Sequence, residues 1–228
     1  MGSEVPRPCT MRVMLRARAI PQATVARLPL YLRALREAAG SATPTLSSEE
    51  LAERAGVTAA QIRKDLSYLG SYGTRGIGYD IEYLTKQICR RLGLDEELRV
   101  AIVGAGNLGV ALARYGGFSN RGFRVVAIFD SDPAKVGTTV ADTKVSSTKD
   151  MSSVLAKRRV DIAVITTPAA AAQWVADVVV DAGVQSILNF APTTVSVPDG
   201  VSIRQVDLGI ELEILSFYRR RVNAAAAV

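Results

Sequence analysis

A glycine-rich segment directly after an apolar stretch constrains the fold of this chain more than any other feature. The segment is Gly104-Ala105-Gly106-Asn107-Leu108-Gly109, and the apolar stretch is residues 99–103. In a strand–turn–helix unit, the first glycine allows the tight turn, the second lets a pyrophosphate approach the backbone, and the third lets the helix pack closely. The N-terminal end of the helix attracts the diphosphate. We therefore predict that residues 104–109 form part of a dinucleotide site.

The pattern after residue 98 predicts a parallel sheet. Apolar stretches of strand length alternate with helical segments, an order typical of a sheet that is covered by helices on both faces. The expected strands are 99–103, 123–129, 161–166, 184–190 and 201–206, and a final helix begins near Leu208. We therefore expect a Rossmann-like domain at residues 99–206.

Residues at the carboxyl ends of these strands are candidates for the rest of the nucleotide site. Asp130 ends the second strand, where a carboxylate would accept hydrogen bonds from the adenosine ribose and repel the extra phosphate of NADP. The alternative is a turn residue before Asp132-Pro133. Ligands lie beyond the carboxyl ends of parallel strands, so we expect residues 166–168 and 189–192 to face the nicotinamide half. The cofactor-binding candidates outside the glycine segment are Asp130, Lys135, Thr166, Thr167, Pro168, Asn189 and Phe190.

The residues that a dehydrogenase would need are missing from the sequence. Its proton donor is typically a His, Lys or Tyr activated by a neighbour. The chain has no histidine, and none of its seven tyrosines has a lysine four residues later. We therefore predict nucleotide binding without turnover and no catalytic residues. A NAD-dependent oxidoreductase and a CoA-binding module are the alternatives, and Asp130 argues against CoA because CoA carries a phosphate on its adenosine ribose.

Two closely spaced helix-start signals precede the sheet. After a helix expected from Ile20 to Gly40, Ser47-Ser48-Glu49-Glu50 matches a capping box and starts a short helix to Ala55. Gly56 suits a sharp turn, and Thr58-Ala59-Ala60-Gln61 is a second capping box two residues later. This arrangement predicts a helix-turn-helix.

The second helix of this motif has one apolar face and one polar face. Ile62, Leu66 and Leu69 recur at the spacing of a core-facing stripe. The polar face suits DNA, because arginine and glutamine can bond base edges while lysine and serine can hold phosphates. A solvated helix face is the alternative. Residues 70–79 contain four glycines and predict a hairpin, or wing, whose tip arginine suits the minor groove. The DNA-binding candidates are Gln61, Arg63, Lys64, Ser67, Tyr68 and Arg75.

The charge distribution favours a polyanionic partner for the first part of the chain. Residues 1–92 hold 14 Lys or Arg against 8 Asp or Glu, and the remainder holds 14 of each, so the formal charge of +6 lies entirely in the first part. Only Cys9 and Cys89 are present, which together with the lack of histidine excludes zinc fingers and imidazole-ligated metals and fits a cytoplasmic protein. No apolar run approaches the roughly 20 residues of a membrane span. We expect a disordered basic tail at residues 1–19 and neither a membrane nor a metal partner.

Several short motifs occur in order along the chain, at residues 20–24, 27–29, 63–68, 76–79, 104–109, 168–173, 189–192 and 206–208. Through these motifs, residues 20–217 closely resemble the Rex family of bacterial redox-sensing transcriptional repressors. The expected fold class is α/β. A winged helix-turn-helix domain at 20–80 is followed by a connecting helix and linker at 81–98, the Rossmann-like domain at 99–206, and a domain-swapped C-terminal helix and tail at 207–228.

The resemblance implies a homodimer in which each C-terminal helix packs against its partner. It also implies that the dimer binds inverted-repeat operator DNA, that NADH is the effector that releases it, and that NAD+ competes without causing release. Arg27, Tyr115 and Asp207 would relay the redox state. The apolar residues of 208–217 spread over more than one helix face, which a partner could cover, and packing on the chain's own sheet is the alternative.

Overall fold

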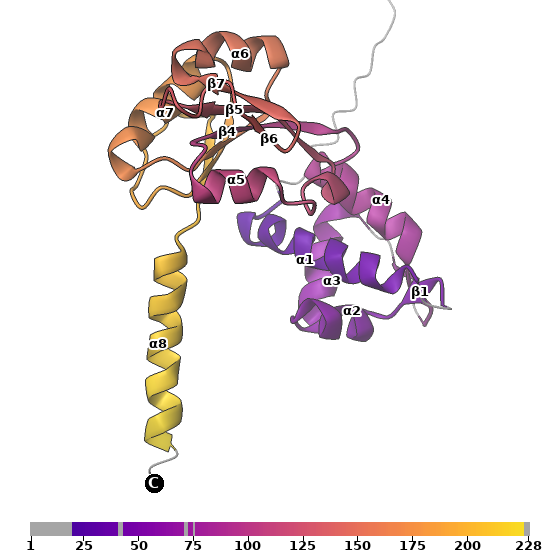
Figure 1. The fold of residues 1–228 in the computed structure, drawn as a ribbon. Helices are drawn as coiled ribbons and strands as arrows, with labels where there is room; N and C mark the ends of the chain where they lie inside the picture. The colour runs from indigo at the N-terminus through magenta and orange to yellow at the C-terminus, as the bar shows by residue number, and fades with distance from the viewer. Residues whose placement is uncertain (1–19, 41–42, 71–72, 75, 226–228) are drawn as a thin grey trace, which may run out of the picture. The chain divides into compact units, whose positions relative to one another are not determined.

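The structure is a computed structural model that describes residues 20–40, 43–70, 73–74 and 76–225 (Figure 1). The chain divides into two compact units, Met1–Gly93 and Leu94–Val228. The expected tail at residues 1–19 and the expected wing-tip residue Arg75 lie outside the described residues.

The described residues of the first unit form four helices. They are α1 (Gln22–Ala38), α2 (Ser48–Ala55), α3 (Ala59–Leu69) and α4 (Ile81–Leu92). α1 packs against α2 and α4, and α2 packs against α3. The apolar stripe predicted for α3 is buried, together with side chains from all three other helices. α4, expected as a connecting helix, belongs to this unit, because its apolar face of Ile81, Leu84 and Ile88 is buried here.

The helix-turn-helix is fixed by its caps. The Ser47 hydroxyl accepts the Glu50 N–H, and the Glu50 carboxylate accepts the Ser47 N–H at 2.8 Å, so the first capping box is confirmed. Gly56 ends α2 with a φ of 68°. The second capping box is wrong in one half. Thr58 accepts the Gln61 N–H at 3.2 Å, but the Gln61 side chain donates to Asp65 at 2.9 Å, because a buried carboxylate attracts an amide more strongly than an exposed backbone group does.

A small antiparallel sheet completes the first unit. Its strands are β1 (Thr45–Leu46), β2 (Gly73–Thr74) and β3 (Gly78–Asp80), in the order β1-β3-β2. The hairpin predicted within residues 70–79 is therefore present, and β1 joins it as a further strand. Asp80 then caps α4 by accepting the Tyr83 N–H at 2.7 Å.

The second unit is built on a seven-stranded sheet. Its strands are β4 (Leu98–Val103), β5 (Phe123–Asp130), β6 (Thr139–Val140), β7 (Thr143–Ser147), β8 (Ile162–Ile165), β9 (Ser186–Asn189) and β10 (Ser202–Gln205). The order is β10-β9-β8-β4-β5-β7-β6, and only the β6–β7 pair is antiparallel. The five predicted strands are confirmed. β6 and β7 are absent from the prediction because they are short and contain few apolar residues.

Helices cover both faces of this sheet, as predicted. Alternate residues of β4 face opposite sides: Ala101 and Val103 join the core that contains α6 (Met151–Arg158) and α7 (Ala169–Asp181). Val100 and Ile102 pack on the other side, with Leu112 of α5 (Asn107–Ala113). Figure 1 shows α5 on the opposite side of the sheet from α6. β5 lies next to β4 on one side, and β8 lies next to it on the other, so the strand order reverses at β4. A crevice is expected beyond the carboxyl ends of the strands at such a point.

The final helix, α8 (Leu208–Ala225), carries an uncovered apolar surface. Seven of its large side chains are 46–67% exposed: Leu208, Ile210, Leu212, Ile214, Leu215, Phe217 and Tyr218. The helix therefore does not bury its apolar residues on the chain's own sheet. Exposed apolar side chains gathered on one helix are typical of an interaction site.

Candidate functional site

A pocket of about 750 Å³ lies where the carboxyl ends of β4, β5 and β8 meet. Its lining contains Gly104, Gly106, Asp130, Lys135, Thr166, Thr167 and Pro168 from the predicted set. It also contains Ser131, Asp132, Thr148, Ala171, Trp174 and Val175, which the sequence analysis missed. Trp174 could have been anticipated, because it lies on the helix that begins directly after Pro168. It is half-exposed and is the only tryptophan of the chain.

The three glycines of the segment meet different requirements. Gly104 has a φ of 109°, and a Cβ there would lie 2.8 Å from the Thr166 carbonyl oxygen. A Cβ on Gly109 would lie 1.8 Å from the carbonyl oxygen of Gly104, so the fold itself requires glycine at both positions. A Cβ on Gly106 would meet no protein atom within 4 Å. The backbone at Gly106 is therefore open toward the pocket, as an approaching pyrophosphate requires.

Asp130 is a buried carboxylate at the end of β5. Its Oδ2 accepts the Ala105 N–H at 2.8 Å and the Lys135 ammonium at 3.1 Å, and its Oδ1 accepts the Asp132 N–H at 2.8 Å. Burial alone would raise the pKa of Asp130, but the Asp132, Lys135 and Ala105 donors outweigh it and hold the pKa below its ordinary value. The pocket therefore presents an ionised carboxylate, and the N–H of Ala105 is directed to it.

The two threonines after β8 differ in what they bond. The Thr166 hydroxyl donates to the carbonyl oxygens of Val103 and Gly104, at 3.1 and 2.8 Å, and so ties the glycine turn to β8. The hydroxyl oxygen of Thr167 is buried and has no hydrogen-bond partner among the described residues. Because buried polar groups are almost always paired, Thr167 is the group here that most needs a ligand.

Other residues of the predicted set lie outside this pocket. Asn189 is fully buried, and its amide donates to the Thr193 carbonyl and to Gln205 and accepts the Ala191 N–H, so it joins β9 to β10. Phe190 packs on the opposite face of the sheet, against the core around Val164. Asn107 and Leu108 are exposed at the start of α5.

Three residues of the polar face predicted for α3 are exposed, namely Arg63, Lys64 and Ser67. Arg63 donates to Ser48 at 2.7 Å and to Glu49 at 3.1 Å on the surface. Ser67 donates to the Lys64 carbonyl at 2.7 Å. The Lys64 side chain takes part in no ion pair within the described parts of the chain. Tyr68 is partly buried.

A cluster around Asp65 joins α1 to α3, and the sequence analysis missed it. The Asp65 side chain is 1% exposed and accepts hydrogen bonds from four side chains: Thr24 at 2.9 Å, Arg27 at 2.6 and 2.9 Å, Tyr31 at 2.6 Å, and Gln61 at 2.9 Å. Burial raises the pKa of Asp65, but these donors, Arg27 first, bring it down to about 2. The bond to Asp65 raises the pKa of Arg27, and burial raises that of Tyr31.

The three residues of the expected relay are engaged in separate local contacts. Arg27 belongs to the Asp65 cluster. Tyr115 is half-exposed and meets Phe118 edge to face, with ring centroids 5.4 Å apart. Asp207 accepts the N–H groups of Gly209 and Ile210 and so caps α8.

Comparison with curated proteins decides the family. The chain is 61% identical over 212 residues to the redox-sensing transcriptional repressor Rex of Streptomyces griseus subsp. griseus, covering 93% of this chain and 84% of that protein. It is 46% identical over 203 residues to Rex of Pelotomaculum thermopropionicum, covering 89% and 95%. The chain belongs to the Rex family of redox-sensing transcriptional repressors. Its close Rex relatives are regulators and not enzymes.

Solved structures of the Rex family agree with this assignment. RSP in complex with β-NAD+ and operator DNA has a TM-score of 0.85 and 36% identity, covering 92% of this chain and 97% of that one. RSP in complex with β-NADH has a TM-score of 0.82 and 35% identity, covering 92% and 99%. Two family models also match, "Putative DNA-binding protein N-terminus" at residues 19–67 and "CoA binding domain" at residues 95–193.

The described residues contain neither a candidate membrane-spanning helix nor a candidate metal site. None of their helices is long and apolar enough to cross a membrane. No group of three or more His, Cys, Asp or Glu side chains in the described ranges is placed to hold a metal ion.

Proposed function

We propose that this chain is a repressor that binds operator DNA through α3 and its wing, and that NADH bound in the pocket of the second unit releases it. The observation that carries the proposal is the pairing of an open backbone at Gly106 with an ionised carboxylate at Asp130 in one pocket. The first can receive a pyrophosphate and the second a ribose diol. NAD+ would occupy the same pocket as a competitor that does not cause release.

The pocket fits an unphosphorylated ribose better than a phosphorylated one. A carboxylate with a depressed pKa repels the 2'-phosphate of NADP and the 3'-phosphate of CoA. The match to a CoA binding domain therefore reflects the shared sheet and glycine turn. We assign the pyrophosphate to residues 104–109 and the ribose to Asp130. Lys135 holds Asp130, and Thr167 and Pro168 lie toward the nicotinamide half.

The DNA-binding surface follows from α3 and the charge of the first unit. Arg63 is exposed and its partner Glu49 is 69% exposed, so the ion pair is weak enough to be exchanged for a base edge or a phosphate. Lys64 is available for a phosphate, and Ser67 and Tyr68 lie one turn farther along the helix. The bond from Gln61 to Asp65 leaves Gln61 less free than the sequence suggested. We place the protein in the cytoplasm, where a bacterial operator lies.

We further propose a homodimer in which a second copy covers α8. Seven large apolar side chains remain at least 46% exposed on this helix, and exposed apolar surface of this kind is typical of an interface. Half-sites of an inverted repeat require two reading helices at a fixed spacing, so closure of the dimer around NADH would move them out of register. Arg27, Tyr115 and Asp207 are the residues that we expect to carry this change.

Fluorescence anisotropy of a labelled inverted-repeat operator tests the proposal. NADH, NAD+ and NADPH are titrated into the complex at fixed salt. We expect NADH alone to release the DNA. Operator binding that no nucleotide reverses would contradict the sensor function, and a lack of DNA binding would contradict the repressor function.

Replacing Asp130 with alanine is expected to weaken NADH binding by about tenfold to a hundredfold, the loss of one or two hydrogen bonds to a charged group. Operator binding should remain, since α3 lies in the other unit. The readout is energy transfer from Trp174, which lines the pocket, to the reduced nicotinamide. Asp199→Ala, which removes an exposed carboxylate of the same unit, is the control. Unchanged NADH affinity in Asp130→Ala would rule out the ribose assignment.

Replacing Lys64 with alanine is expected to weaken binding to all DNA sequences and to reduce the slope of log K against log salt by about one, as for the loss of a single phosphate contact. Lys86→Ala is the matched control, because Lys86 is an exposed lysine of the same unit that is paired with Glu82. An unaltered slope would remove Lys64 from the phosphate contacts.

Replacing both Leu212 and Leu215 with lysine is expected to convert the dimer to monomers, because each charge would have to be buried in the interface. Sedimentation of the wild type, this variant and Glu213→Lys measures the effect. Glu213 is an exposed charged residue of the same helix, so its variant should remain a dimer. A monomeric wild type, or a double variant that still dimerises, would contradict the role of α8.

A further inference from the structure

β5 and β7 are paired at one end and separate at the other. Their ladder covers Ile128–Asp130 against Val145–Ser147. Toward Arg124 the strands part, because β7 begins as one arm of a hairpin with β6. The β4–β5 register also shifts by one residue here, which makes Val126 the extra residue of a bulge. The Thr143 hydroxyl donates across the gap to the Val125 carbonyl at 3.4 Å.

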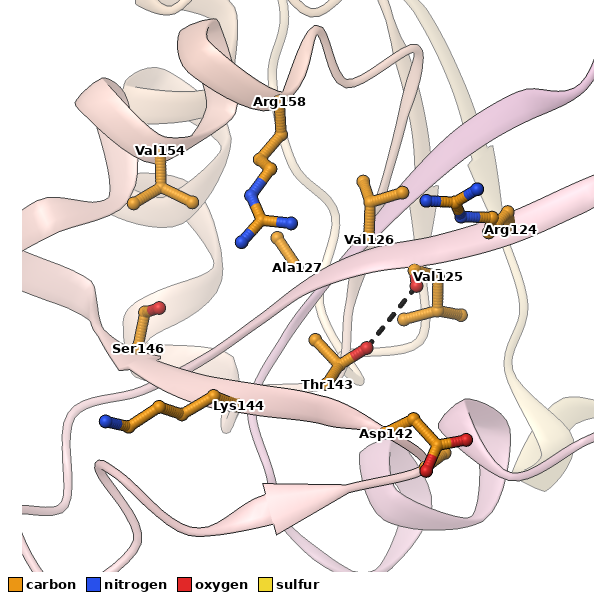
Figure 2. A pocket seen from close by; sticks show the side chains of 11 residues that line it. Arg124, Val125, Val126, Ala127, Asp142, Thr143, Lys144, Ser146, Val154 and Arg158 are labelled. Atoms are coloured by element: carbon orange, nitrogen blue, oxygen red, sulfur yellow. Dashed lines mark hydrogen bonds between the residues drawn. The ribbon is translucent and has the colours of Figure 1, made fainter.

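The gap is a pocket of about 510 Å³ (Figure 2). Its lining combines polar groups with the apolar residues Val125, Val126, Ala127, Ala141 and Val154. Its lining shares no residue with that of the nucleotide pocket. A concave surface that combines apolar side chains with a few polar groups is a usual form of a small-molecule site.

The charged groups of this pocket are mostly cationic. Arg124, Lys144 and Arg158 line it, against the single carboxylate of Asp142. Arg124 is paired with Glu97 at 3.4 Å. The side chains of Lys144 and Arg158 form no ion pair with any residue that the structure describes. Figure 2 shows the Arg158 guanidinium extending from the end of α6 toward Ala127. The second unit has no net charge, so this cationic pocket is a local feature.

We propose that this pocket binds a small organic anion. Arg158 holds a carboxylate or phosphate head, and a short apolar chain lies against Val154 and the edge of Val126. A guanidinium offers paired donors that match either head group, and the apolar side chains strengthen the interaction by excluding water. β5 continues from this pocket to Asp130, so the anion site and the nucleotide site lie along the same strand. The two linings share no residue, so the anion does not compete with the nucleotide.

Amide NMR spectra of the full-length protein, recorded without nucleotide, test the proposal. The probes are hexanoate, n-butyl phosphate, inorganic phosphate and 1-butanol. We expect saturable shifts at residues 124–127 and 142–146 with n-butyl phosphate or hexanoate, and the stronger of the two identifies the head group. Inorganic phosphate, without the apolar chain, and 1-butanol, without the charge, should each bind at least tenfold more weakly.

Arg158→Gln should weaken the binding of the better probe by about tenfold, as for the loss of one charge-assisted hydrogen bond. Lys157→Gln, the exposed neighbour on α6, should leave it unchanged. No saturable shift at these residues would overturn the proposal, as would equal binding of 1-butanol or equal affinity in Arg158→Gln and Lys157→Gln. None of these outcomes depends on NADH, so they are separate from any failure of the nucleotide function.

Discussion

Replacing Gly106 with alanine is expected to reduce NADH affinity by about a hundredfold or more while the stability of the protein stays nearly unchanged. The added methyl group would point into open space, and the φ of −80° is one that alanine adopts readily, so the fold tolerates it. The pyrophosphate would lose its approach to the backbone and with it at least two charge-assisted hydrogen bonds. Trp174 energy transfer measures the affinity, and thermal unfolding measures the stability.

Gly109→Ala is the matched control within the same segment. Its Cβ would lie 1.8 Å from the Gly104 carbonyl oxygen, so the turn between β4 and α5 has to move. We expect this variant to lose at least about 1–3 kcal/mol of unfolding free energy, as for overpacking of a core. If Gly106→Ala unfolds the protein, or binds NADH as the wild type does, the distinction between a glycine kept for the ligand and glycines kept for the fold is wrong.

The parts of the fold that the sequence predicts are those with strong local patterns. β4 and β5 contain unbroken apolar runs at residues 100–103 and 125–129, and the helix-turn-helix has its signals in capping residues within a few positions of each other. β6 and β7 have neither property, since Thr143-Lys144-Val145-Ser146-Ser147 has only one buried apolar residue. β7 is held by pairing with β5, and β6 in turn pairs with β7.

The residues of the candidate site also divide into those that a local pattern predicts and those that it does not. The glycine segment and Asp130 are predictable because strand, turn and helix fix them by short spacings. Asn189 also lies at a strand end, but Gln205 and the turn after β9 take all its hydrogen bonds, which no local pattern reveals. No local pattern distinguishes Asp65 from the other polar residues of α3. Its role depends on hydrogen bonds from Thr24, Arg27 and Tyr31, which lie on α1.

Replacing Asp65 with alanine is expected to cost about 3–5 kcal/mol of unfolding free energy in the first unit, the usual effect of removing one partner of a buried ion pair. The buried Tyr31 hydroxyl and the Arg27 guanidinium would lose their acceptor, and α1 would lose its polar connection to α3. Operator binding should therefore fail. NADH binding should persist, because Trp174 and the nucleotide pocket belong to the second unit.

Glu49→Ala is the control, since it removes an exposed carboxylate that also pairs with an arginine, and we expect it to change the stability far less than Asp65→Ala does. Hydrogen exchange of α1 and α3 amides separates the first unit from the second. An Asp65→Ala protein within about 1 kcal/mol of the wild type would show that apolar packing alone holds α1 on α3.

The pH dependence gives an independent measure of the same cluster. Because the folded pKa of Asp65 is about 2, below its ordinary value near 4, the carboxylate contributes stability that is present above about pH 4 and is lost as the pH falls toward 2. The contribution is about 2 kcal/mol. Asp65→Ala lacks this titration, so the stability difference from the wild type should shrink by that amount between pH 5 and pH 2, whereas Glu49→Ala, which removes an exposed carboxylate whose pKa is also lowered, should change the profile less. A difference that stays constant over this range would mean that folding does not shift the pKa of Asp65, and the contacts of Arg27 would then need another explanation.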